Sequence, residues 1–122
     1  MMVGMGLGMV DRDIEVGREY KVGTFTLNGV TYDRYVKVID FGALPNTTTK
    51  LVPHGTSITN KNQILGIAAI AVSSASAVTI PFVSAVSANV INIWCNETNI
   101  SITPSFDATD YASCFVTLEY YK

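Results

Sequence analysis

The stretch QILGIAAIAV, Gln63–Val72, is apolar at almost every position. Successive side chains of a β-strand point to opposite faces. One face therefore receives Ile64, Gly66, Ala68, Ile70 and Val72, and the other receives Leu65, Ile67, Ala69 and Ala71. A strand that is apolar on both faces needs cover on both. A two-layer antiparallel sandwich covers one face with its own core, so we expect a neighbouring subunit to cover the other. We assign Leu65, Ile67, Ala69 and Ala71 to that subunit interface.

The rest of the chain has the same β character. Thr, Val, Ile and Tyr recur between Gly, Pro, Asn and Asp, and almost no segment shows the helical period of about 3.6 residues. Tyr20–Leu27 and Val30–Asp40 flank Asn28-Gly29, a pair that tolerates the positive φ angles of a type I′ turn. We therefore predict a hairpin there. Asn89–Cys95 and the strand that starts at Ile100 form a second predicted hairpin.

The segment DFGALPNTTTK, Asp40–Lys50, is predicted to turn the chain between two strands. Gly42 ends a strand, and Pro45 pushes Leu44 into an extended conformation, where Leu44 plugs the end of the core. The β-branched residues Thr47–Thr49 are expected to restart a strand. DFG also occurs in protein kinases, but the sequence lacks the Gly-rich loop, the strand lysine and the H-R-D loop that a kinase needs.

The strand count predicts the fold class. Pro81 marks an edge or a bulge within Val78–Ser84, and the last strand, Ala112–Tyr121, ends just before the C-terminus. About eight strands in all predict an all-β, antiparallel, jelly-roll-like sandwich. We assign residues 20–122 to this domain and residues 1–19 to an N-terminal arm. Its apolar start, Met1–Val10, is either a flexible leader or an arm that becomes ordered against a partner.

Composition limits the partners of the chain. Of 122 residues, 48% are apolar and 15% are charged, whereas roughly a quarter of residues are charged in a typical soluble domain. Either the core is unusually large or much of the surface is covered by copies of the chain, and for so short a chain we favour the second, so we expect self-association. The net charge of −2 and the scattered Lys and Arg residues give no basic stripe, and we expect no nucleic-acid partner. Met1–Val10 is far shorter than the ~20 residues of a membrane span, so we expect no membrane insertion.

No set of residues predicts an enzyme. His54 is the single histidine, and no nucleophile motif such as G-x-S-x-G accompanies it. One histidine and two strand cysteines, Cys95 and Cys114, lack the clustered spacing of a zinc site. Both cysteines fall on the apolar phase of their strands, so we expect buried free thiols. We therefore expect no catalytic residue, no metal and no cofactor.

A loop and a strand carry the candidates for contact with a glycan. Asp107 and Asp110 lie in one loop with Phe106 and Tyr111. Carboxylates beside aromatic rings are typical of a surface that contacts sugars, although turn chemistry alone also explains aspartates in a loop. Trp94, on the polar phase of its strand, is a similar candidate. An exposed tryptophan also packs against partner chains, and this alternative stays open.

Two blocks of the sequence are similar to a known family. The first is YDRYVKVIDFGALPNTTTK, Tyr32–Lys50, followed by Val52-x-His54-Gly55, and the second is FVTLEYYK, Phe115–Lys122. They resemble a domain of tailed-bacteriophage virion proteins, which occurs mostly at the C-terminal end of tail fibres and receptor-binding proteins and in some head fibres. The resemblance covers about Tyr20–Lys122, with a variable middle.

The resemblance implies a β-rich virion structural protein, usually trimeric and without catalytic machinery, that is made in the bacterial host cytoplasm. It carries over no set of binding residues, because the middle and the loops vary among such proteins. Phe25 and Val30-Thr31 stand where family members more often have a Trp and a Lys-Pro pair.

A chain of 122 residues that begins at Met1 is shorter than a long fibre. We therefore expect either a receptor-binding fibre tip, which contacts a host surface glycan or protein, or a decoration protein on the capsid surface. In both cases the Gly/Met leader is expected to anchor the protein to other virion proteins. The alternative is a bacterial carbohydrate-binding module, which only Trp94, Tyr111 and the loop aspartates support.

Overall fold

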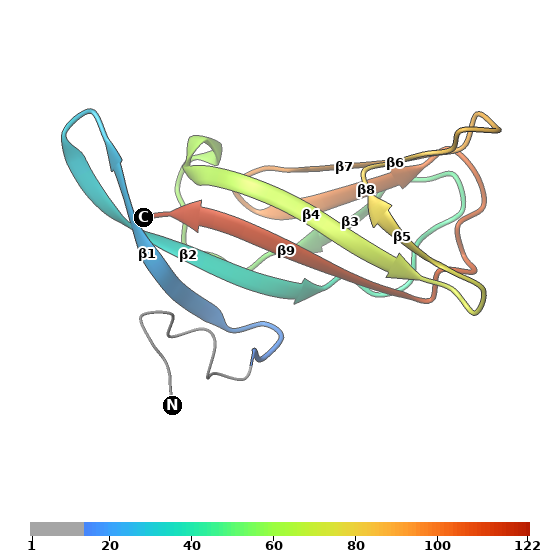
Figure 1. The fold of residues 1–122 in the computed structure, drawn as a ribbon, viewed down its shortest axis with the longest axis horizontal. Coiled ribbons are helices and arrows are strands. Elements are labelled where there is room, and N and C mark those ends of the chain that lie inside the picture. Colours follow the sequence, from blue (N-terminus) through green and yellow to red (C-terminus); the bar gives the residue numbers. More distant parts are fainter. Residues whose placement is uncertain (1–13) are drawn as a thin grey trace.

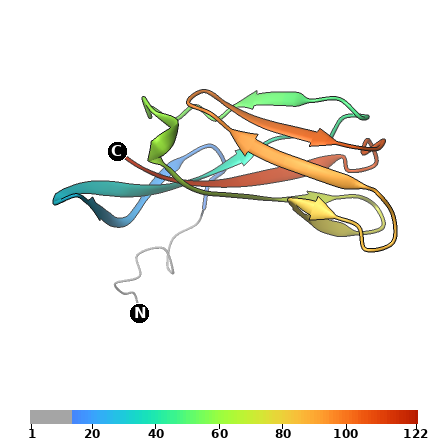
Figure 2. The same cartoon turned by 90° about the horizontal axis from the view of Figure 1, so that it is seen from above.

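The chain folds into two antiparallel β-sheets packed face to face (Figure 1, Figure 2). The computed structural model describes residues 14–122. Its elements are β1 (Glu19–Leu27), β2 (Val30–Asp40), β3 (Lys50–Pro53), the 3-10 helix η1 (Lys61–Gln63), β4 (Ile64–Val72), β5 (Ala77–Ile80), β6 (Phe82–Val83), β7 (Val90–Cys95), β8 (Asn99–Pro104) and β9 (Ser113–Tyr121). The prediction of an all-β antiparallel sandwich is confirmed.

The strands are divided unevenly between the two sheets. One sheet has the spatial order β1-β2-β9-β4-β5 and the other β3-β8-β7-β6, and we call them the large sheet and the small sheet. Two connections cross from one sheet to the other: the one from β2 to β3 and the one from β8 to β9. They run side by side in opposite directions, because β2 pairs with β9 and β3 pairs with β8. These nested crossings give the jelly-roll character that we expected, whereas the β4–β5 and β7–β8 hairpins each stay within one sheet.

The turn between β1 and β2 has the predicted chemistry. Asn28 and Gly29 have φ angles of 52° and 81°, and a type I′ turn requires positive φ at both positions. The hairpin extends past the small sheet at one end of the molecule (Figure 1), where its tip exposes Leu27 and Val30.

The predicted N-terminal arm and anchor, residues 1–19, falls largely on residues 1–13, which lie outside the described residues. The described domain begins close to the expected boundary, because Glu19 is the first residue of β1. Just before it, the Gly17 N–H donates to the Val38 carbonyl at 2.7 Å.

Pro81 divides the segment that we expected as a single strand. The residues before it form β5 and pair with β4 in the large sheet, and the residues after it form β6 and pair with β7 in the small sheet. Proline has no backbone N–H to donate to a ladder, so a change of sheet at this position leaves no hydrogen bond unmade. Both β5 and β6 are edge strands, as Pro81 predicted, and the division gives nine strands instead of about eight.

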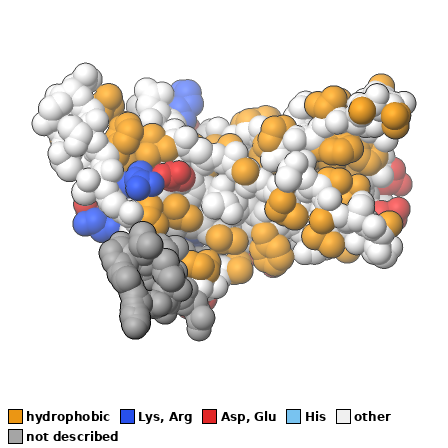
Figure 3. Space-filling model, viewed as in Figure 1, with side chains coloured by type: hydrophobic (Ala, Val, Ile, Leu, Met, Phe, Trp, Pro, Cys, Tyr) orange, Lys and Arg blue, Asp and Glu red, His pale blue; other side chains and the backbone are white. Residues whose placement is uncertain are grey.

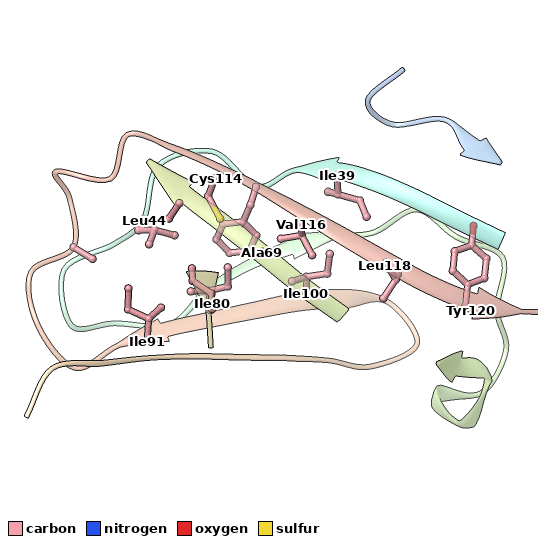
Figure 4. Close-up of a cluster of buried hydrophobic side chains, with 14 of the residues drawn as sticks. Ile39, Leu44, Ala69, Ile80, Ile91, Ile100, Cys114, Val116, Leu118 and Tyr120 are labelled. Atoms are coloured by element: carbon pink, nitrogen blue, oxygen red, sulfur yellow. The ribbon is translucent and has the colours of Figure 1, made fainter. Parts of the chain in front are cut away.

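Alternate residues of β7, β8 and β9 fill the space between the sheets (Figure 4). The fully buried aliphatic side chains include Ile91, Ile100, Ile102, Val116 and Leu118. Leu44, 2% exposed, lies at one end of this cluster and Tyr120 at the other (Figure 4). The prediction that Leu44 plugs the end of the core is confirmed.

β4 is apolar on both faces, but its solvent-facing side is not the one that we assigned to the interface. Ala69 and Ala71 are 4% and 0% exposed and lie in the domain's own core, and Ile67 packs against that core. The interface assignment was therefore wrong for Ile67, Ala69 and Ala71. Leu65 is exposed, at a bulge between Ile64 and Gly66 in the pairing with β9.

Packing explains this error. Ala69 pairs with Val116 of β9 and with Ile80 of β5, and both of these side chains belong to the core. Because the branched neighbours already fill the interior, the small side chains of β4 fit inside, and Ile70 and Val72 face outward. The alternation of apolar residues alone does not distinguish the two orientations, since both faces of the strand are apolar.

The turn after β2 has the predicted corner with one difference. Gly42 has a φ of 80°, and its N–H donates to Asp40 Oδ1 at 3.0 Å. The next strand starts at Lys50 and not at Thr47, as we had expected. Thr47 has a φ of 53°, which lies outside the β region and so excludes this residue from a strand.

Candidate functional site

An apolar patch covers the outer face of the large sheet where β4, β5 and β9 lie side by side. Its largest side chains, Ile70, Val72 and Phe115, are 45%, 41% and 41% exposed. Ile70 pairs with Phe115 on one side and with Thr79 on the other, so these residues form one row. We call the patch the β4 face; it consists of Ala68, Ile70, Val72, Ala77, Thr79, Phe115 and Thr117.

The β4 face is shallowly hollowed and has an uncharged centre. A depression of about 130 Å³ is lined by residues that include Ala68, Ile70 and Phe115. Charges lie at the border of the patch: the exposed Asp40 of β2 pairs with Phe115, and farther along β9 Arg34 donates to the Glu119 carboxylate. Figure 3 shows hydrophobic side chains over this part of the molecule and charged ones toward its two ends. An exposed apolar patch with polar groups at the rim is typical of a contact between protein chains.

The outer face of the small sheet carries Trp94, the single tryptophan of the protein. It is 51% exposed, which confirms the prediction from its polar-phase position that it faces outward. Trp94 pairs with Ser101 of β8, and Ser101 pairs in turn with Leu51 of β3, which is 54% exposed. Trp94, Ser101 and Leu51 therefore form one row across three neighbouring strands.

The next row on this face is polar. Asn92 pairs with Thr103, and Thr103 Oγ1 lies 2.6 Å from Thr49 Oγ1. Residues two apart on one face of a strand are separated by about 6–7 Å, so this row lies directly beside the first. We call the two rows the Trp94 face; it consists of Thr49, Leu51, Asn92, Trp94, Ser101 and Thr103.

Ser101 is fully buried although it lies on an outer face. Its chain neighbours Ile100 and Ile102 belong to the core, so the Ser101 side chain points away from the core, toward the Trp94 face. Within residues 14–122 its Oγ is the one buried side-chain oxygen or nitrogen without a hydrogen-bond partner. Such a group costs roughly 1–3 kcal/mol of stability, so its presence calls for an explanation.

The loop between β8 and β9 closes the Leu44 end of the sandwich. Asp107 Oδ1 accepts hydrogen bonds from the backbone N–H and the hydroxyl of Thr109 at 3.1 and 2.6 Å, and these bonds lower the pKa of Asp107. Phe106 and Tyr111 are partly buried and pack against the core. Turn chemistry and core packing thus account for most of this loop, and Asp110 is exposed.

The structure does not join the proposed glycan contacts into one site. Trp94 pairs with Ser101 near the β7–β8 turn, whereas the loop begins at Ser105 beyond the other end of β8. The rise along the strand separates the two places by roughly 13 Å. The sequence analysis missed Leu51, Ser101 and the polar row, because these residues become neighbours of Trp94 only through the pairing of strands.

Lys50, in the block that resembles the phage family, holds the corner after β2. Its Nζ donates to the carbonyls of Phe41 and Ala43 at 2.9 and 2.8 Å. A Cβ at Gly42 would lie 3.2 Å from this ammonium group, and the positive φ of Gly42 also favours glycine. The DFG segment therefore serves as a structural corner.

Lys37 and His54 hold the next corner in the same way. Lys37 Nζ donates to the carbonyls of His54 and Gly55 at 2.7 and 3.2 Å. The His54 ring is buried, and its Nδ1 accepts from the Thr56 N–H at 3.2 Å. Nε2 therefore carries the proton and donates to the Asn96 carbonyl at 2.8 Å. With both ring nitrogens engaged, His54 has a structural role.

The two cysteines are free thiols, as predicted. Cys114 is fully buried, and burial raises the pKa of its thiol to about 11. Cys95 is partly buried, and burial raises its pKa as well. The expectation of complete burial is thus confirmed for Cys114 alone.

A polar cluster closes the hairpin end of the core. The buried Tyr120 hydroxyl donates to the Glu19 carboxylate, and Lys122 Nζ lies 3.1 Å from the same carboxylate. Burial, followed by the hydrogen bond to Glu19, raises the pKa of Tyr120. The C-terminal residue is thereby tied into the structure.

Among residues 14–122, no group of three or more His, Cys, Asp or Glu side chains is placed to hold a metal ion. In the same part of the chain, no helix has the length and hydropathy of a membrane span. No family model, curated protein or solved structure matches the chain.

Proposed function

We propose that the chain is a non-enzymatic structural protein on the surface of a bacteriophage particle and that it assembles as a homotrimer. Two positions on the particle suit such a protein: the receptor-binding tip of a tail fibre, and a fibre or decoration on the capsid. The sequence blocks Tyr32–Lys50 and Phe115–Lys122 resemble phage fibre domains. This resemblance supports both the proposed location on the virion and the proposed trimeric state.

The proposal of assembly rests on the exposed apolar side chains of the β4 face. Ile70, Val72 and Phe115 expose two-fifths or more of their surface on neighbouring strands. Each apolar square ångström removed from water contributes about 25 cal/mol, so covering this patch with sister copies favours association. The low charge of the whole chain, 15% of residues, is consistent with a surface that is partly buried between copies.

The roles of the family-like residues support a structural protein. Lys37, Lys50 and His54 are occupied by backbone groups of the corners that they hold. A shared framework of this kind fits a family whose members keep their corners and vary their loops. Both nitrogens of His54, the single histidine, are engaged, so this side chain has no free ring nitrogen for acid–base catalysis.

A second candidate function is a bacterial carbohydrate-binding module. The half-exposed Trp94 on a strand of the small sheet favours it. Such a module functions without self-assembly, so the two proposals differ in the expected mass of the protein in solution.

Immunogold electron microscopy of purified phage particles tests the proposed function. We expect antibodies against the β-sandwich domain to label the fibre tips or the capsid surface at regular positions. The label also distinguishes the two positions, which the proposal leaves open. Particles that carry the gene but show no label, while the protein is present in the infected cell, would contradict a role as a virion component.

A further inference from the structure

We infer that the Trp94 face binds the uncharged sugar units of a glycan, with one pyranose ring stacked on Trp94. This inference rests on the proposed function and gives it a ligand, because a fibre tip must contact a molecule of the host surface. It places the ligand on the outer face of the small sheet, away from the β4 face of the large sheet.

Trp94 has the exposure and the support that a stacking platform needs. It is 51% exposed, and its backbone is paired with Ser101 of β8, a strand that is itself paired with β3 on its other side. A position on a regular paired strand limits the directions of the indole ring before a ligand arrives. The apolar C–H face of a pyranose ring packs on such an aromatic surface, while its hydroxyl groups stay available at the ring edge.

Polar groups lie where the edge of a stacked sugar would reach. Asn92 is exposed two residues from Trp94 on the same face, and Thr103 is its partner on β8. The row spacing of about 6–7 Å places these polar groups beyond the edge of a ring stacked on Trp94, within reach of its hydroxyl groups through a hydrogen bond of about 2.8 Å. The amide of Asn92 both donates and accepts, which suits a sugar hydroxyl that does the same.

Ser101 provides the second, independent observation. Its hydroxyl is buried without a partner and lies in the row between Trp94 and Leu51. Leu51, which pairs with Ser101, is 54% exposed, and exposed side chains change rotamer within nanoseconds, so we expect its movement to open Ser101 to a ligand. A sugar hydroxyl then supplies the hydrogen bond that Ser101 lacks in the free protein.

The character of the face selects the class of glycan. All six of its side chains are uncharged: Thr49, Leu51, Asn92, Trp94, Ser101 and Thr103. With no Lys or Arg among them, nothing on the face compensates a carboxylate or a phosphate, so neutral hexose and N-acetylhexosamine units fit best. The amide of Asn92 and the unpaired hydroxyl of Ser101 also distinguish this face from the mostly apolar β4 face, which we assign to sister copies.

Glycan binding by the intact chain tests the inference. The probe is an array of neutral oligosaccharides of glucose, galactose, mannose and N-acetylhexosamines, with sialylated and phosphorylated glycans on the same slide. Trp94 is the single tryptophan, so its fluorescence reports a bound sugar directly. We expect binding to neutral glycans and a change in tryptophan emission on titration. W94A should lower the affinity by about tenfold or more, and L27A, at the distant hairpin tip, should leave it unchanged.

The variant S101A separates a ligand role from a purely structural one. Removing an unpaired buried hydroxyl should leave the unfolding free energy equal or higher, while the loss of a hydrogen bond to the sugar should weaken glycan binding about threefold to tenfold. Unchanged glycan affinity in S101A would overturn the role of Ser101, and unchanged affinity in W94A would overturn the site.

The remaining outcomes are also decisive. Absence of neutral-glycan binding up to about 1 mM ligand, or binding of charged glycans alone, would overturn the inference. A fall in sedimentation mass for W94A would show that Trp94 packs against a second copy, which overturns it as well. A trimer that binds no neutral glycan leaves the proposed assembly standing, whereas a monomer that binds one overturns the assembly and favours the carbohydrate-binding module.

Discussion

The two outer faces of the sandwich expose different kinds of side chain. The β4 face is mostly apolar, with Ile70 and Val72 beside Phe115, and charges such as Asp40 lie at its border. The Trp94 face has one large aromatic ring, a buried hydroxyl at Ser101 and a row of amide and hydroxyl groups. The first face gains most from contact with another apolar surface, and the second offers directed hydrogen bonds. We propose from this difference that assembly and recognition are separated onto opposite sheets.

The orientation of β4 determines which of its side chains face the core, and substitutions that test it should have the largest effect on the free energy of unfolding. Ala71 is fully buried, whereas Ala68, three residues earlier, is exposed on the β4 face. We predict that A71E loses about 4 kcal/mol or more of stability, because it places a carboxylate in the core, whereas A68E changes the monomer by less than about 1 kcal/mol. Urea unfolding of dilute protein, followed by circular dichroism, measures both. If A68E unfolds the domain and A71E does not, β4 faces the other way.

The corner residues lie on neither outer face, so we predict that their substitution changes the stability of the fold but not assembly or glycan binding. K50M removes the donor to the carbonyls of Phe41 and Ala43 and should cost about 1–3 kcal/mol. The matched variant K61M, at an exposed lysine of η1, should cost less than about 0.5 kcal/mol. Neither variant should change the sedimentation mass or the glycan affinity of folded protein. A selective loss of glycan binding in K50M would mean that the family-like block contacts the ligand.

Much of the fold follows from local sequence. The Asn28-Gly29 turn, the inward phase of β7 and β9, and the position of Leu44 are all consequences of turn chemistry and two-residue alternation. The change of sheet at Pro81 and the positive φ of Thr47 are different. They depend on where distant strands lie, so local preference did not predict them.

The surfaces were less predictable than the strands. The sequence identified β4 as apolar on both faces, but the packing of Ala69 against Val116 and Ile80 determines which face is outward. Trp94 was recognised as an outward residue, yet its neighbours Leu51 and Ser101 come from other strands. Such sites depend on register between strands, which an alternation pattern within a single strand does not contain.

The most direct measurement of the central claim is the sedimentation mass of two matched variants. I70E and L51E each place a carboxylate at a half-exposed aliphatic position, the first on the β4 face and the second on the Trp94 face. We predict that the unaltered protein and L51E sediment near three times the chain mass of 13.2 kDa, and that I70E sediments near one chain mass. A trimer that persists in I70E but dissociates in L51E, or an unaltered protein that stays monomeric at high concentration, would contradict assembly through the β4 face.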